Sequence, residues 1–322
     1  MPTAGVIQGT GGETRLVVSG GWSEAAAAEI AAREFDRLEF HGGEYADFGF
    51  LAPYAAKITS LAVMSGTWTD AGGLGELTSL RSLTLGSPLR GVDFSRLPSL
   101  ESLNLGSWTS GYGKSLFDCR ELKSLHVEGF GDTGCERIAR LTALESLSLA
   151  RGKLEVLAGL RHCVSLRSVQ FAHLRKLADL SEMASLRSLR ELELVERLPR
   201  IDNARAAMQA EQLRRLDLRG IELEFDDLSW LKRMSRLNVL GLRKVHRPDW
   251  DCLFASRELK KIAVAFVKPP HVSIDEVRAA AIERGLKPTE VKPLGVPHKP
   301  VGFVVEFRPE GSTRNLWFWR DP

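Results

Sequence analysis

This chain of 322 residues has few cysteines and none of the short motifs that mark common enzyme classes. It contains no GxSxG nucleophile turn, no HExxH metal motif, no P-loop and no GxGxxG after an expected strand. Its four cysteines, Cys119, Cys135, Cys163 and Cys252, form no CxxC pair and fall in apolar columns. We therefore predict reduced core cysteines, and neither an enzyme nor a protein with a metal ion or cofactor.

Long apolar runs are also missing. No segment approaches the ~18 apolar residues of a membrane span, and no basic-plus-apolar signal precedes the first expected strand. We therefore expect a cytoplasmic protein that does not contact membranes, and the abundant Ala, Arg and Gly suggest a bacterial source. The hydrophobic content of 43% is ample for a folded core.

What the sequence has instead is one frame, leucine-x-x-leucine-x-leucine, that returns about every 22 residues. Such a period is typical of a solenoid. Two weaker copies at Phe35 and Ile58 precede the clear ones. The clear copies start at Leu80, Leu100, Leu122, Leu144, Leu166, Leu189, Leu213, Leu237 and Leu259.

Each copy predicts one strand and one turn. Offsets are counted from the first residue of each copy. The apolar residues at offsets 3 and 5 alternate as in a strand with one buried face. A second apolar set follows at three-residue spacing, as in Leu154, Leu157 and Leu160, which suits a short 3₁₀ or helical turn. Stacked units bury the apolar faces that one unit cannot, so we expect a curved parallel sheet on the concave side and turns on the convex side.

The repeats resemble the leucine-rich-repeat family in its shorter bacterial-type form, over residues 35–266. The resemblance implies an α/β solenoid that binds other proteins. The family usually has Asn at offset 8, where it satisfies backbone groups, but this chain has no such Asn ladder. We expect apolar residues such as Phe130, Leu174 and Ile221 to fill that corner by packing.

Both ends of a solenoid need caps, because an open end exposes its core. Residues 1–45 are interpreted as an N-terminal cap of a strand and a helix, with Ser23 as N-cap, together with the first repeat. Residues 46–267 form the repeat array. Residues 268–322 are expected to be a helix plus a β-hairpin, acting as a cap or as a small appended module.

The C-terminal segment carries several local signals. Ser273 and Glu276 form a capping-box pair ahead of a helix that stops at Gly285. A Pro-rich connector over 287–300 and a strand over 301–307 follow. A turn over 309–312 then leads to a second strand over 316–319. Trp317, Phe318 and Trp319 cannot all be buried in a two-stranded hairpin, which favours packing onto the last repeat or onto a partner.

Offsets 2, 4 and 6 of each strand point away from the core and line the concave face. The first two-thirds of this face is small and neutral. Its offset-2 column has Ser60, Ser82, Ser102, Ser124, Ser146 and Ser168. This column has two interpretations: a wettable structural ladder, or a smooth floor that a partner approaches closely. His126 and His173 are interpreted as surface or edge histidines.

In the last third of the concave face, the side chains are larger and charged. Residues 1–150 contain 12 Lys+Arg and 18 Asp+Glu, whereas residues 151–322 contain 32 and 23. The basic excess in the second part predicts an acidic partner, although nearby acidic residues partly neutralise it. Residues of the predicted binding site on the concave face are Arg215, Arg219, Arg243, Lys261, Glu193 and Asp217.

Aromatic residues near the strand ends are a second set of candidates. Trp68 and Trp108 follow strands and are interpreted mainly as core or corner packing. Tyr112 is the better candidate for an exposed contact residue, so it joins the predicted binding site.

The sequence thus favours a non-enzymatic scaffold that binds another protein. One specific alternative is a bacterial immunity or inhibitor protein that covers a toxin or an enzyme. Another is a weak nucleic-acid-binding protein, which the net charge of +3 and the acidic first half disfavour. An enzyme with an active site assembled from distant residues is the least favoured alternative, and no small-molecule substrate is expected.

Overall fold

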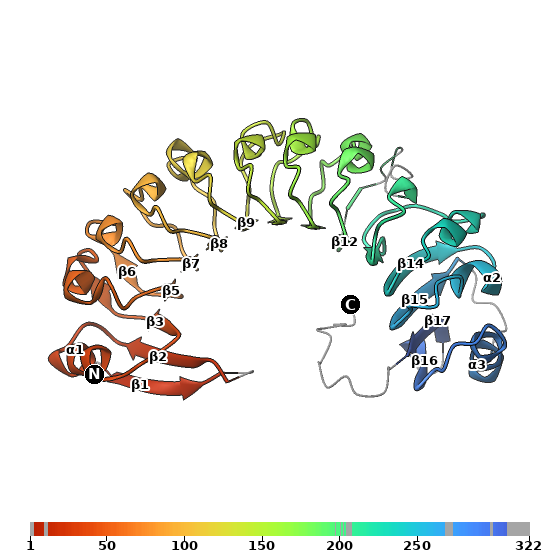
Figure 1. Ribbon diagram of the computed structural model, residues 1–322, viewed down its shortest axis with the longest axis horizontal. Coiled ribbons are helices and arrows are strands. Elements are labelled where there is room, and N and C mark those ends of the chain that lie inside the picture. Colours follow the sequence, from red (N-terminus) through yellow and green to blue (C-terminus); the bar gives the residue numbers. More distant parts are fainter. Residues whose placement is uncertain are drawn as a thin grey trace.

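The computed structural model describes residues 3–9, 12–196, 198–199, 201, 203, 208–267, 273–296 and 299–307. The chain forms an arc whose inner side is lined by strands and whose outer side carries short turns (Figure 1). The two ends of the array face each other across the concave space (Figure 1).

One sheet contains fifteen of the described strands, in the order β1-β2-β3-β5-β7-β8-β9-β10-β11-β12-β13-β14-β15-β17-β16. These strands are β1 (Thr3–Gln8), β2 (Thr14–Ser19), β3 (Arg37–His41), β5 (Ser60–Val63), β7 (Ser82–Leu85), β8 (Ser102–Leu105), β9 (Ser124–Glu128), β10 (Ser146–Ala150), β11 (Ser168–Ala172), β12 (Glu191–Val195), β13 (Arg215–Asp217), β14 (Val239–Val245), β15 (Lys261–Phe266), β16 (Glu290–Val296) and β17 (Lys299–Glu306). A second, two-stranded sheet pairs β4 (Glu44–Tyr45) with β6 (Thr67–Trp68).

The helical elements lie outside the sheet. The α-helices are α1 (Glu24–Ala32), α2 (Trp250–Leu253) and α3 (Ile274–Glu283). The 3₁₀ turns are Gly49–Tyr54, Leu74–Glu76, Phe94–Arg96, Tyr112–Lys114, Leu116–Asp118, Ile138–Arg140, Leu160–His162, Ser181–Ser185 and Ser229–Arg233. The 3₁₀ turns therefore occupy the part of each repeat where three-residue apolar spacing predicted them.

The leucine frame produces this architecture by stacking equal positions of successive repeats. Leu125 pairs with Leu147 in the parallel register of β9 and β10, and Leu147 pairs with Val169 of β11. All three side chains are buried in one continuous apolar core. The convex leucines, such as Leu154 and Leu160, are buried in the same core.

Apolar packing fills the corner after the strand in several repeats, as the sequence predicts. Phe130, Leu174 and Ile221 are all buried at the positions where the Asn ladder is missing. The residue just before this corner is left-handed in several repeats, as Arg151, His173, Glu196 and Lys244 show. Such a backbone is less favourable for residues other than Gly, so the packed corner must hold it in place.

The N-terminal end of the sheet is covered by a strand and a helix. β1 pairs antiparallel with β2, a strand that the sequence analysis did not anticipate. The Ser23 hydroxyl caps α1 by accepting a hydrogen bond from the Ala26 N–H at 3.2 Å. The backbone hydrogen-bonding groups of β2 are thus paired on both of its sides.

At the other end, the capping box of α3 forms as predicted. The Glu276 N–H donates to the Ser273 hydroxyl at 3.1 Å, and the Ser273 N–H donates to the Glu276 carboxylate at 2.6 Å. β17 includes residues 301–306 of the strand expected over 301–307 and pairs antiparallel with β15. The expected connector over 287–300 was wrong in part, because β16 begins at Glu290 and pairs with β17. The turn over 309–312 and the strand over 316–319 lie outside the described residues.

Candidate functional site

The concave face is a continuous surface formed by the outward-facing side chains of the sheet strands. The serine column runs in register along it, from Ser60 paired with Ser82 to Ser146 paired with Ser168. These serine side chains are partly exposed. The floor of this region is therefore smooth and polar, without a projecting large side chain in that column.

A chain of three hydrogen-bond contacts and one ion pair crosses five strands of the concave face, from β9 to β13. His126 Nδ1 lies 2.9 Å from the Ser148 hydroxyl, which donates to Gln170 Oε1 at 3.0 Å. Gln170 Nε2 donates to the Glu193 carboxylate at 2.9 Å, and Arg215 pairs with the same carboxylate at 3.2 Å. We call these five residues the concave relay.

The donors of the concave relay all point toward Glu193. The single hydroxyl proton of Ser148 is used on Gln170, so His126 Nδ1 must be the donor in its contact with Ser148. Burial lowers the pKa of His126, with Glu128 opposing that shift, which favours a neutral imidazole. A neutral ring that donates through Nδ1 keeps Nε2 as an acceptor.

The predicted basic residues are accompanied by carboxylates. Arg219 donates to Asp217 through both Nε, at 2.9 Å, and Nη2, at 2.7 Å. Lys261 pairs with Glu306 of β17 at 2.7 Å, and Arg243 pairs with Glu222 at 3.2 Å. The last third of the face is therefore a mosaic of ion pairs rather than a continuous basic surface.

The structure brings most of the predicted site residues together and separates one of them. Arg215, Arg219, Lys261, Glu193 and Asp217 lie on the concave strands β12 to β15 or directly after one of them. The expectation for Tyr112 was wrong. Its side chain is 1% exposed, lies in the 3₁₀ turn that follows β8, and accepts a hydrogen bond from the Leu89 N–H at 2.7 Å.

Trp68 and Trp108 pack against the core, as the sequence analysis favoured. Trp68 stacks on Tyr45 and on Phe48, with ring centroids 4.1 Å apart in both pairs. Trp108 meets Phe130 edge to face at 5.2 Å. Neither indole is therefore needed as a contact residue to explain its place in the fold.

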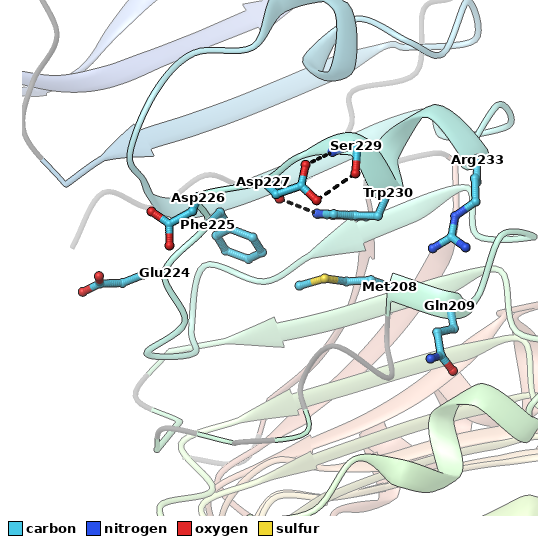
Figure 2. A pocket seen from close by; sticks show the side chains of 9 residues that line it. All are labelled: Met208, Gln209, Glu224, Phe225, Asp226, Asp227, Ser229, Trp230 and Arg233. Carbon is cyan, nitrogen blue, oxygen red and sulfur yellow. Dashed lines mark hydrogen bonds between the residues drawn. The ribbon is translucent and has the colours of Figure 1, made fainter.

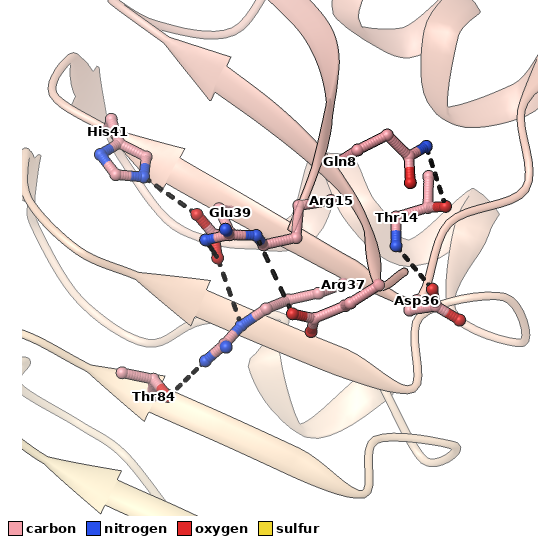
Figure 3. Close-up of polar contacts among 9 residues, drawn as sticks. Gln8, Thr14, Arg15, Asp36, Arg37, Glu39, His41 and Thr84 are labelled. Atoms are coloured by element: carbon pink, nitrogen blue, oxygen red, sulfur yellow. Dashed lines mark hydrogen bonds and ion pairs between the residues drawn. The ribbon is translucent and has the colours of Figure 1, made fainter. Parts of the chain in front are cut away.

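A second charged cluster, which the sequence analysis missed, lies at the N-terminal end of the concave face (Figure 3). Glu39 is 6% exposed and is approached by Arg15 and Arg37 at 3.5 Å and by His41 at 3.2 Å. Arg37 reaches past β5 to donate to the Thr84 hydroxyl at 3.0 Å. Reading offsets 2, 4 and 6 in the weak copy at Phe35 would have revealed Arg37, Glu39 and His41.

A hollow of about 520 Å³ lies on the convex side beside β13 and β14 (Figure 2). Its lining residues include Met208, Phe225 and Trp230. The Asp227 carboxylate accepts hydrogen bonds from Ser229 N and Oγ, both at 2.8 Å. Trp230 Nε1 donates to the Asp227 carbonyl at 3.2 Å. Asp227 therefore stabilises the start of the Ser229–Arg233 turn, a structural role that requires no ligand.

No metal or thiol chemistry is evident in the described residues. Among them, no three His, Cys, Asp or Glu side chains are grouped closely enough to hold a metal ion. All four cysteines are free thiols, and only Cys119 is partly exposed. Burial raises the pKa of the Cys119 and Cys163 thiols to about 11, so neither is a reactive thiolate at neutral pH. No helix within the described ranges is long and apolar enough to cross a membrane.

Comparison with known proteins identifies the fold. No protein-family model matches the sequence, and no curated protein sequence is similar to it. Among solved structures, an internalin from Listeria monocytogenes superposes with a TM-score of 0.56 at 21% identity, over 84% of each chain. A leucine-rich-repeat protein from Leptospira interrogans gives 0.45 at 16% identity, over 77% of this chain and 76% of that one. The parallel sheet, the 3₁₀ turns and the internalin match together show that this chain has the leucine-rich-repeat solenoid fold.

Proposed function

We propose that the chain is a non-enzymatic scaffold that binds another protein on its concave face. The observation that carries the proposal is the layout of this face. The column of small serines lies between the cluster around Glu39 at the N-terminal end and the Arg219–Asp217 pair in the C-terminal third. Small floor residues let a partner's backbone approach closely. The Glu39 cluster and the Arg219–Asp217 pair, held by the sheet, can then set its orientation.

We infer further that the partner presents carboxylates to the C-terminal third of the face. An arginine has five N–H donors, and a single carboxylate uses at most two of them in a forked pair. Arg215 and Arg243 each have one ion pair described above, and both guanidinium groups remain partly exposed. A partner carboxylate can therefore bind such a group without breaking its existing pair.

The test is affinity capture from native lysate, with the wild type compared to an Arg215→Glu, Arg219→Glu, Arg243→Glu variant. The captured protein is then titrated against both chains. Loss of three favourable charge contacts should weaken binding on the order of tenfold or more. Unfolding curves of both proteins must coincide for the comparison to count.

A matched control reverses the same number of charges outside the concave strands. Arg187, Arg233 and Arg236 are exposed and come from the same part of the array. Changing these three to Glu should leave capture unchanged. Equal losses in the two variants would mean that only net charge matters. Capture that nuclease abolishes would instead support the nucleic-acid alternative.

A further inference from the structure

The two outer strands of the sheet differ in how they are protected against pairing with another chain. Among the described residues, β1 pairs only with β2 and β16 only with β17, so each has one edge without a partner strand (Figure 1). β16 carries Lys292, Pro293 and a register shift after Leu294, all of which discourage pairing. β1 contains no charged residue, no proline and no register shift. Its edge is therefore an open template for another strand.

The free edge of β1 is formed by the backbone groups of every second residue. The Gly9 N–H, just after β1, donates to the Glu13 carbonyl at 2.7 Å. The carbonyl of Thr14, which lies opposite the last residue of β1, instead accepts from the Asp36 N–H at 2.8 Å. Hydrogen-bonded and non-hydrogen-bonded pairs alternate in an antiparallel ladder, so these two bonds fix the residues of β1 that face β2. The residues whose backbone groups point away from β2 are Ala4, Val6 and Gln8.

On its concave face, β1 carries a projecting side chain and an open space two residues away. Ile7 is 51% exposed, and a Cβ added at Gly5 would meet no atom within 4 Å. Both residues belong to the concave face, since they lie opposite Arg15 and Val17 of β2. The strand thus has an apolar side chain to offer and a space able to receive one.

A second copy of β1 fits this edge when the two strands run antiparallel with Val6 on the two-fold axis. Ile7 of each copy then lies opposite Gly5 of the other, so each projecting side chain covers an open space. The outward backbone groups of Val6 pair with those of the other Val6, and those of Ala4 pair with those of Gln8. Neither strand brings a charge to the junction, so no like charges oppose each other there.

We propose that the chain forms a symmetric dimer in which the β1 strands of two copies pair antiparallel and join the two sheets into one. The contact consists of one short strand from each copy, so the dimer should be weak and dissociate on dilution. The two concave faces continue into each other across the junction. Dimer formation does not depend on any other protein, so this proposal and the proposed function fail separately.

The first test is sedimentation velocity of the full chain over a wide range of concentration, in which the wild type should shift from monomer to dimer. Gly5→Lys should weaken the dimer about tenfold or more, because each lysine occupies the space that receives Ile7. The same open space leaves the monomer unstrained. Met64→Lys is the matched control, because Met64 is 43% exposed and follows β5, away from both edges of the sheet. It should leave the dimer unchanged.

A second test measures the register of the two strands and covers the case in which Gly5→Lys fails to fold. Gly5→Cys in one preparation and Ile7→Cys in another place thiols opposite each other only when the two are mixed. The Cα atoms of such a non-hydrogen-bonded pair lie about 4.5 Å apart, which suits a disulfide. Mild oxidation should therefore give a covalent dimer several-fold faster in the mixture than in either preparation alone or in the wild type.

Three results would overturn the proposal. The first is a wild type that stays monomeric at every concentration, which would leave the edge of β1 to a strand of another protein. The second is a dimer that Gly5→Lys and Met64→Lys weaken equally or not at all. The third is equal cross-linking in the mixture and in the single preparations, which would place the contact between copies elsewhere.

Discussion

At the scale of single residues, the Tyr112 side chain ties two neighbouring repeats together. Its hydroxyl accepts the Leu89 N–H across 23 residues of sequence, and its ring meets Phe94 edge to face at 5.6 Å. Burial raises the pKa of this phenol, with the hydrogen bond from Leu89 opposing the shift. The phenol therefore stays neutral throughout the physiological pH range.

Tyr112→Phe should accordingly destabilise the fold. The substitution keeps the ring but leaves the buried Leu89 N–H without an acceptor, which costs about 1–3 kcal/mol. Tyr54→Phe is the control, because Tyr54 is only partly buried. Urea unfolding followed by circular dichroism would measure both. Equal stability of Tyr112→Phe and the wild type would show that water replaces the lost acceptor.

Sequence spacing placed Tyr112 after a strand but could not show the direction of its side chain. Its place near the end of a strand favoured an exposed contact residue, whereas Tyr112 lies in a short turn, Tyr112–Lys114, in which its ring is buried. Phe130 and Leu174 were predicted correctly because they occupy a column that recurs in every repeat. Periodic positions are thus predictable from sequence, while isolated ones depend on local turn geometry.

At the scale of elements, the concave relay adds side-chain contacts on the concave face to the backbone hydrogen bonds and core packing that already join β9 to β13. Within the relay, Ser148 of β10 joins His126 of β9 to Gln170 of β11. Loss of the Ser148 hydroxyl leaves the partly buried His126 imidazole and Gln170 amide each without one hydrogen-bond partner. The relay also fixes the Glu193 carboxylate that pairs with Arg215.

Ser148→Ala should lower the free energy of unfolding by about 1–2 kcal/mol, because two side-chain hydrogen bonds disappear. Ser146→Ala, on the same face of β10, should change it by less than about 0.5 kcal/mol, since that side chain lies outside the relay. Chemical denaturation of the two variants and the wild type, run in parallel, measures these differences in the free energy of unfolding. Indistinguishable losses would indicate that the relay adds nothing beyond the hydroxyl itself.

Strands were predicted well wherever the leucine frame is clear, and poorly where it ends. β16 was missed because Pro293 and Pro300 suggested a connector. Proline lacks an N–H, but β16 pairs on one side only, with β17. An edge strand tolerates proline on the side that has no partner strand. The N-terminal charged cluster was missed for a similar reason, since its strand belongs to a weak copy of the frame.

At the scale of the whole molecule, the strands at the two ends of the sheet close the apolar core of the array. β17 is antiparallel to β15, whereas the neighbouring repeat strands are parallel. It also brings Phe303 and Val305 into the core. Without it, β15 would expose a row of unpaired N–H and C=O groups beside an open apolar core, which is a template for aggregation.

Truncation after Val267 should therefore yield an aggregating protein, and truncation after Phe307 should not. The first removes α3, β16 and β17, and the second keeps all three while deleting residues 308–322. Light scattering during size-exclusion chromatography, with circular dichroism on the same fractions, distinguishes the two outcomes. A soluble, equally stable product of the first truncation would make residues 268–322 an appended module. The last repeat would then have to close its own core, which the burial of Phe303 and Val305 argues against.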